Sequence, residues 1–303
     1  KFGIIGGPDS DVPFWTIFTG MIIVNFYYWG TNQAIIQRAL GAKNLKEGQK
    51  GLLLAAFLKI LGPIIVVLPG IIAFYIFKGD LANADEAYPM LVKKILPTAF
   101  VGFFAAVLFG AILSSFNSAL NSSVTLFGLD FYKQYIDKTA SDVKIVKAGK
   151  IFGAFLAIFS MAIAPLLYGV QGGIFTYLQE LNGTHSVPIL AIVIVGIFSK
   201  RVTAKGANMA ILFSVITYLV ALYVVRPISI ENGTHFPHFL HLMGIIFALA
   251  LIIMFTVSYF KPRETDYVQE YTKQVDIQNW KYLKPVGFSI CGIVLLIYIY
   301  FAN

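Results

Sequence analysis

The sequence predicts an all-α integral membrane protein that crosses the bilayer several times. Of its 303 residues, 58% are hydrophobic and only 13% are charged, and its mean hydropathy is +0.77. This composition lies outside the range of soluble globular domains. Apolar runs long enough to cross about 30 Å of hydrocarbon recur along the whole chain, which leaves little room for a soluble domain.

Eight such runs are predicted to span the membrane: 13–39, 51–77, 98–120, 148–168, 173–198, 204–226, 239–260 and 285–301. Most Lys and Arg residues follow the first, third, fifth and seventh runs, whereas the other loops hold only Lys78, Lys93, Lys94 and Arg226. Short loops rich in Lys and Arg stay cytoplasmic, so both chain ends are predicted to face the outside. The net charge of +8 is then a consequence of topology, and we expect no nucleic-acid partner.

A polar and aromatic cluster interrupts the first apolar run. It contains Asn25, Tyr27, Tyr28, Trp29, Thr31, Asn32 and Gln33 around Gly30. One interpretation is a helix broken at mid-membrane, because unwound backbone is tolerated where it lines a cavity. The alternative is a kinked helix whose amides bond neighbouring helices.

Two further positions place polar groups deep in apolar runs, where they are costly. Lys59 lies roughly 12 Å beyond the cytoplasmic end of its run at 1.5 Å per residue. It can either snorkel along its alkyl stem toward the interface or donate hydrogen bonds to a polar solute. Gln179 is followed by Glu180, whose carboxylate is paired with a cation, faces water or lies near a solute. For Gln179 and Glu180, a polar lining and a purely structural role both remain open.

Small polar residues mark the third run. Ala111 lies one helical turn before Ser114 and Ser115, so a carbonyl and two hydroxyl oxygens can converge on one point. Hard cations such as Na⁺ prefer oxygen ligands of this kind. The same spacing is also typical of close helix packing in membranes. No cluster of nucleophile, base and orienting residue occurs at the span ends, so we do not expect an enzyme.

Several motifs together resemble the solute:sodium symporter family, in particular its sodium/glucose and sodium/galactose branch. They are Asn25-Phe26-Tyr27-Tyr28-Trp29-Gly30-Thr31-Asn32-Gln33, the run from Gln37 to Asn44, Phe57-Leu58-Lys59, the run from Ala111 to Ser122, Tyr177-Leu178-Gln179-Glu180 and Phe198-Ser199-Lys200-Arg201-Val202. The similarity covers most of the chain, although the last two runs match only in hydropathy and position.

The resemblance implies an inverted-repeat symporter fold. Residues 1–199 would form the second five-helix repeat, its first helix broken near 25–31. Residues 200–303 would form three peripheral helices with a charged cytoplasmic linker at 261–284. Because the first repeat has no counterpart here, and because the sequence begins at Lys1 instead of Met, we expect the C-terminal portion of a longer protein.

The resemblance also implies a function and the residues that carry it. Asn25, Lys59 and Gln179 would bond sugar hydroxyls, and Tyr28 would stack on the sugar ring. The sodium ligands would be the Ala111 carbonyl and the Ser114 and Ser115 hydroxyls, with further ligands from the missing repeat.

The expected activity is Na⁺-coupled symport of a hexose such as glucose or galactose by alternating access, in a multi-pass protein of the cell membrane. The alternatives are another cargo on the same fold (inositol, sialic acid, proline or an organic anion) or a membrane solute sensor without transport.

Overall fold

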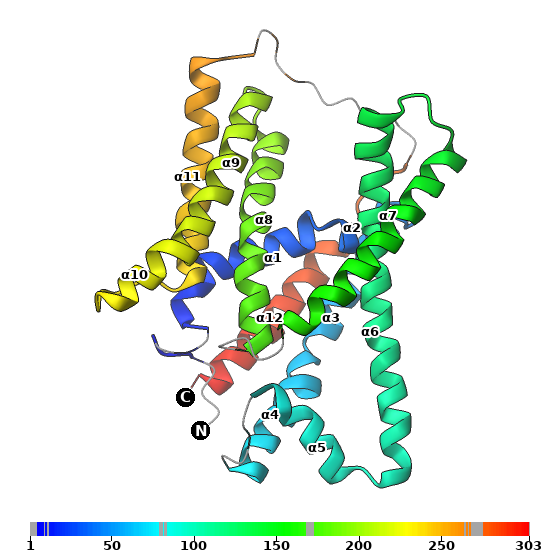
Figure 1. Ribbon diagram of the computed structural model, residues 1–303, viewed down its shortest axis with the longest axis vertical. Coiled ribbons are helices and arrows are strands. Elements are labelled where there is room, and N and C mark those ends of the chain that lie inside the picture. Colours follow the sequence, from blue (N-terminus) through cyan, green and yellow to red (C-terminus); the bar gives the residue numbers. More distant parts are fainter. Residues whose placement is uncertain are drawn as a thin grey trace. The chain divides into compact units, whose positions relative to one another are not determined.

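The computed structural model describes residues 5–8, 10, 12–78, 81, 84–167, 173–263, 265, 267 and 275–302 (Figure 1). Within these residues the secondary structure is entirely helical, as the sequence predicts. The chain divides into two compact units. Unit 1 comprises Lys1–Leu53 and Phe175–Asn303, and unit 2 comprises Leu54–Ile174.

The helices of unit 1 are η1 (Phe14–Phe18), α1 (Gly20–Gly30), α2 (Gln33–Leu40), α3 (Leu45–Lys59), α8 (Gly173–Phe198), α9 (Ala204–Val220), the π-helix η5 (Ala221–Val225), α10 (Arg226–Glu231), α11 (Phe239–Phe260) and α12 (Leu283–Phe301). Of these, α3 and α8 each run a few residues into unit 2. The helices of unit 2 are α4 (Gly62–Phe77), η2 (Ala84–Glu86), α5 (Ala87–Ile95), α6 (Thr98–Leu126), the π-helix η3 (Phe127–Ile136), α7 (Asp142–Ile163) and η4 (Ala164–Leu167).

Seven helical stretches in the described part of the chain are long and apolar enough to cross a membrane. They are Leu45–Phe77, Thr98–Ile136, Asp142–Leu167, Gly173–Phe198, Ala204–Glu231, Phe239–Phe260 and Leu283–Phe301. Each overlaps one of the predicted runs. The predicted run 13–39 differs, because it is divided into η1, α1 and α2, none of which exceeds 11 residues.

The division between α1 and α2 has a local cause. The Tyr27 carbonyl accepts hydrogen bonds from the N–H groups of both Thr31 and Asn32, at 2.9 and 3.0 Å, and from the Thr31 hydroxyl. The Asn32 side chain then accepts the Ala34 N–H at 3.0 Å and caps the new helix. Asparagine is a preferred N-cap, so the sequence itself ends one helix and begins the next.

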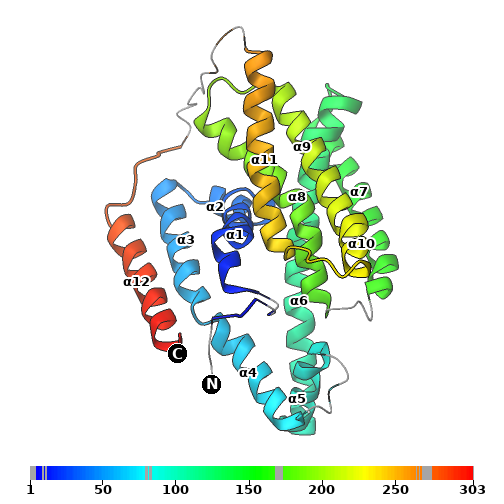
Figure 2. The ribbon, with the colours of Figure 1, turned by 90° about the vertical axis from the view of Figure 1, so that its left-hand side faces the viewer.

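The core of unit 1 lies among α1, α8, α9 and α11 (Figures 1 and 2). Its fully buried side chains include Val187, Tyr218, Leu240, Met243 and Ile246. The helices α9 and α11 approach closely because Gly206 has no side chain. A Cβ at this position would lie 2.9 Å from the Met254 carbonyl oxygen. Small residues at helix interfaces allow this approach in membrane proteins.

The helix α1 crosses α11 at a second close contact. A Cβ on Gly20 would lie 2.2 Å from the carbonyl oxygen of Leu240. Beside it, the Thr19 hydroxyl and His241 Nδ1 form a hydrogen bond of 3.0 Å. This crossing places α1 against the core through Ile23, Val24 and Tyr27, which are all buried.

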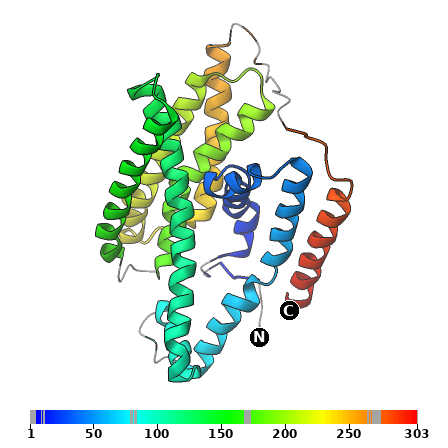
Figure 3. The same ribbon diagram turned by 90° about the vertical axis from the view of Figure 1, so that its right-hand side faces the viewer.

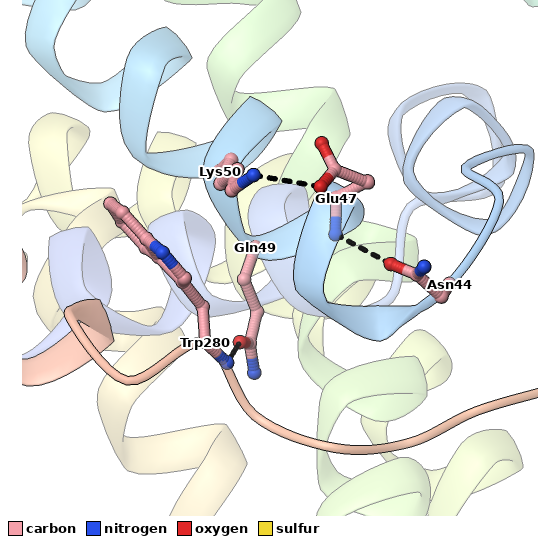
Figure 4. A network of polar contacts seen from close by, with 5 residues as sticks. All are labelled: Asn44, Glu47, Gln49, Lys50 and Trp280. Atoms are coloured by element: carbon pink, nitrogen blue, oxygen red, sulfur yellow. Dashed lines mark hydrogen bonds and ion pairs between the residues drawn. The ribbon is translucent and has the colours of Figure 1, made fainter.

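The segment before α12 is attached to the start of α3 (Figure 4). Gln49 holds it with both ends of its amide: Oε1 accepts the Trp280 N–H at 2.8 Å, and Nε2 donates to Asn279 Oδ1 at 2.6 Å. The Leu45 N–H also donates to the Asp276 carbonyl at 3.1 Å. The helix α12 then lies beside α3, with Gly287 facing Leu53 (Figure 3).

In unit 2, α6 and α7 pack through two glycines spaced by four residues. Cβ atoms on Gly149 and Gly153 would lie 2.7 and 2.8 Å from the methyl groups of Val124, which sits between them. The rings of Phe127 and Phe152 stack nearby with centroids 4.1 Å apart. This is the small-residue packing typical of membrane helices.

Candidate functional site

Asn25 and Tyr28 lie on the face of α1 that turns away from the core of unit 1. Tyr27 on the opposite face is 6% exposed, whereas Tyr28 is 37% exposed and packs edge-on against Trp29. Asn25 is exposed, and its Nδ2 donates to the Met21 carbonyl at 2.8 Å. Among the described residues, the second amide hydrogen and the amide oxygen of Asn25 have no partner, so both can serve a ligand. An amide and an aromatic ring therefore share one accessible face of α1.

Gln179 lies on α8, near the N-terminal end of that helix. It is half-buried, and among the described residues its side-chain amide has no hydrogen-bonding partner. A half-buried amide without a protein partner can serve a polar ligand, because it both donates and accepts. The helix α8 is thus the second element of unit 1 that carries a residue predicted to bind solute.

Glu180 is paired with Arg226, which decides between the alternatives that the sequence left open. Arg226 Nη1 donates to Glu180 Oε1 at 2.7 Å, and the two side chains are 40% and 16% exposed. The hydroxyl of Tyr218 also donates to the Glu180 backbone carbonyl, at 3.0 Å. Two side chains from the α9–α10 region therefore hold the backbone and side chain of the residue next to Gln179.

Sequence reasoning placed Arg226 in an outside loop and assigned it no partner. The structure places it directly after η5, whose residue Tyr223 lies beside Tyr177 and near Glu180. Short π-helical segments inside α-helices are frequent at functional sites. The sequence held one indication that Arg226 has a specific partner, because Arg226 is one of very few cations in the loops predicted to lie outside.

A third contact explains why α8 sits so close to α9. A Cβ on Gly183 would lie 2.4 Å from both the Tyr218 hydroxyl oxygen and Met243 Cε. Further along α8, His185 meets the edge of Tyr27 with ring centroids 5.5 Å apart. The helix carrying Gln179 and the helix carrying Asn25 and Tyr28 are therefore in direct contact.

Lys59 is the last residue of α3, and it is exposed. The helix ends there because Pro63 has no N–H to bond the Lys59 carbonyl, and Leu61 instead bonds Leu58 at 3.0 Å. A cation at a helix C-terminus interacts favourably with the helix dipole. The ammonium group of Lys59 therefore lies at the break between α3 and α4, within the predicted run 51–77.

Ala111, Ser114 and Ser115 share one face of α6, and all three are exposed. The Ser118 hydroxyl donates to the Ser114 carbonyl at 2.8 Å, so the backbone of this turn is already engaged. Among the described residues the Ser114 and Ser115 hydroxyls have no partner. Two free hydroxyl oxygens and one carbonyl fit part of an oxygen site for a hard cation.

The predicted site residues divide between the two units. Asn25, Tyr28 and Gln179 belong to unit 1, where the contact between α1 and α8 brings their helices together. Lys59, Ala111, Ser114 and Ser115 belong to unit 2. Within the described residues no group of three or more His, Cys, Asp or Glu side chains could hold a metal ion.

Comparison with known proteins identifies one family. The model of the sodium:solute symporter family matches residues 8–214. The uncharacterized symporter YidK of Escherichia coli strain K12 is 40% identical over 299 residues, which cover 98% of this chain and 51% of that protein. The sodium/glucose cotransporter of Vibrio parahaemolyticus is 43% identical over 212 residues, covering 65% of this chain and 39% of that protein.

A mammalian relative supports the same family, and a solved structure shares the fold. The human sodium/myo-inositol cotransporter 2 is 32% identical over 281 residues, covering 83% of this chain and 41% of that protein. A substrate-bound, outward-open Na⁺-coupled sialic acid symporter has the same fold, with a TM-score of 0.67 and 23% identity over 84% of this chain and 52% of that one. The chain thus spans about half or less of the length of each protein that it matches.

Proposed function

The chain belongs to the sodium:solute symporter family, and from this membership we propose that it is the C-terminal part of a transporter that uses the inward movement of Na⁺ to take up a sugar or polyol. Proteins of this family are transporters rather than enzymes, and this chain is part of a multi-pass protein of the cell membrane. Residues 1–199 act as the second inverted repeat in this proposal, and 200–303 as the peripheral helices.

One structural observation carries the proposal: Asn25 and Tyr28, an amide and an aromatic ring that both suit a sugar, share the accessible face of α1. Asn25 and Gln179 supply amides that both donate and accept, as hydroxyls require. Tyr28 supplies a ring for the apolar C–H face of a pyranose. For Lys59, the proposal rests on the family resemblance alone. The names of the sodium/glucose and sodium/myo-inositol relatives support a polyhydroxylated solute.

In the proposal, Na⁺ binds the Ala111 carbonyl and the hydroxyls of Ser114 and Ser115, together with ligands from outside this chain. Sodium stabilises the arrangement in which the solute site is formed, so each ligand raises the affinity for the other. Each 100 mV of membrane potential contributes about 2.3 kcal/mol per charge moved. A tenfold accumulation of solute needs about 1.4 kcal/mol, so one Na⁺ per solute suffices.

Uptake into proteoliposomes tests the proposal. We would reconstitute the full-length protein and measure uptake of radiolabelled glucose, galactose, myo-inositol, sialic acid and proline, with and without an inward Na⁺ gradient. We expect Na⁺-dependent uptake of a hexose or inositol that is lost in Gln179→Ala and retained in Gln278→Ala, an exposed glutamine in the segment before α12.

The outcomes separate the alternatives. Uptake of proline or sialic acid alone would keep the symport mechanism and remove the sugar assignment. Solute binding without uptake, and without dependence on Na⁺, would show a sensor instead of a transporter. Full activity of Gln179→Ala would remove Gln179 from the solute site.

A further inference from the structure

A groove with a basic end lies between α9 and α11, away from the residues of the proposed solute site. Its volume is about 380 Å³, and it is lined by Lys205, Asn208, Met209, Val257, Phe260 and Lys261. It lies at the start of α9 and the end of α11, and these two helices belong to the candidate membrane spans Ala204–Glu231 and Phe239–Phe260. The basic loops predict that this end faces the cytoplasm.

The charged and apolar parts of the groove are separated along the helix axes. Lys205 comes from the first turn of α9, and Lys261 directly follows α11, so the two ammonium groups come from different helices at the same end. Neither has a carboxylate partner among the described residues. Asn208 adds an amide donor one turn after Lys205.

The walls of the groove are apolar and open to the surroundings. Met209, one turn below Lys205, is 55% exposed, and Phe260, just before Lys261, is 75% exposed. In a membrane protein such side chains meet acyl chains, while lysines at the helix ends lie at the level of the headgroups. The groove therefore offers two cations and an amide at headgroup level, with an apolar surface directly beneath.

We propose that this groove binds one anionic phospholipid of the cytoplasmic leaflet. Its phosphate lies between Lys205 and Lys261 and accepts a hydrogen bond from Asn208, and an acyl chain lies along Met209, Val257 and Phe260. Basic pockets between membrane helices on the cytoplasmic side favour lipids of this charge. A zwitterionic lipid fits less well, because its ammonium group would face two lysines without a counter-charge.

Native mass spectrometry of the purified full-length protein, titrated with phosphatidylglycerol or phosphatidylcholine, tests this proposal. We expect Lys205→Ala/Lys261→Ala to lower the affinity of one phosphatidylglycerol site about tenfold or more, as expected for the loss of two cations near an anionic headgroup. Lys205→Arg/Lys261→Arg should retain it. Lys93→Ala/Lys94→Ala, which removes two lysines from the side predicted to face outward, should leave it unchanged.

Three results would overturn the assignment. Equal retention of phosphatidylglycerol by wild type and Lys205→Ala/Lys261→Ala would show that the groove holds no such lipid. Loss of the lipid in Lys200→Ala/Arg201→Ala alone would move the site to the separate groove of about 570 Å³ between α8 and α11 that these residues line. Displacement of the lipid by inorganic phosphate would assign the two lysines to a soluble anion.

Both lysines are exposed, so their replacement should leave folding intact. Equal melting temperatures of wild type and Lys205→Ala/Lys261→Ala in phosphatidylcholine would verify this, and Phe260→Ala provides an independent variant. If an acyl chain lies on the groove wall, Phe260→Ala weakens phosphatidylglycerol binding while both lysines remain. Unchanged binding in Phe260→Ala would contradict the acyl contact.

Discussion

Replacing Gly20 by alanine tests the crossing between α1 and α11, which holds the helix with Asn25 and Tyr28. The new Cβ would lie 2.2 Å from the Leu240 carbonyl oxygen and 2.7 Å from the Leu240 Cα, whereas ordinary Cβ contacts begin at 3.4 Å. The two helices would have to separate by about 1 Å, the difference between 3.4 and 2.2 Å. Because the obstacle is backbone, no change of rotamer relieves the clash.

The expected cost follows from this geometry. Overpacking a well-packed interior costs about 1–3 kcal/mol, and a clash with backbone belongs at the upper end of that range. The separation would also lengthen the hydrogen bond of 3.0 Å between Thr19 and His241. The higher helix propensity of alanine offsets little of this cost, because Gly20 is the first residue of α1.

Thermal unfolding of the purified full-length protein measures the effect. We expect Gly20→Ala to lower the melting temperature by several degrees. Gly30→Ala, at the other end of the same helix, serves as the control, because no described atom lies within 4 Å of its new Cβ. Equal melting temperatures for Gly20→Ala and Gly30→Ala would refute the close crossing.

Four further predictions concern contacts away from that crossing. Arg226→Ala should destabilise the protein by about 1–2 kcal/mol, less than a fully buried pair would lose because Arg226 is 40% exposed, and the exchange Glu180→Arg/Arg226→Glu should recover part of the loss in chemical unfolding. Gly153→Val should cost about 1–3 kcal/mol by displacing Val124, whereas Gly102→Ala, with no described atom within 4 Å of its new Cβ, should cost little in the same measurement. Gln49→Ala should speed hydrogen exchange of the Trp280 amide, and Lys46→Ala should not; equal rates in both variants would contradict the attachment of this segment to α3. Hydrogen bonds from Lys144 and Thr139 hold the pKa of Asp137 below its usual 3.8, so the stabilisation from this carboxylate is present at neutral pH and is lost as the pH falls through the lowered pKa. Asp137→Asn should therefore melt below wild type at pH 7, and the difference should vanish in strong acid.

Hydropathy alone predicted most of the architecture. A single apolar segment of sufficient length satisfies its backbone groups in a bilayer by forming a helix, and seven of the predicted runs overlap described helices that are long and apolar enough to span. The break near Asn32 is equally local, because the N-cap side chain bonds a backbone group two residues away at 3.0 Å. The family could also be predicted from the sequence, since each of its motifs is a contiguous run of residues.

Tertiary structure decided which polar groups are engaged with protein and which remain available. Glu180 and Arg226 are 46 residues apart, and Gln49 and Trp280 are 231 apart, so neither pair can be inferred from periodicity. The sequence by itself determined that the chain is helical, lies in the membrane and carries amides and hydroxyls within its spans. Only the packing of distant helices decided that Glu180 is neutralised by Arg226 while the Gln179 amide beside it has no partner among the described residues, because burial and pairing depend on neighbours that the local sequence does not specify.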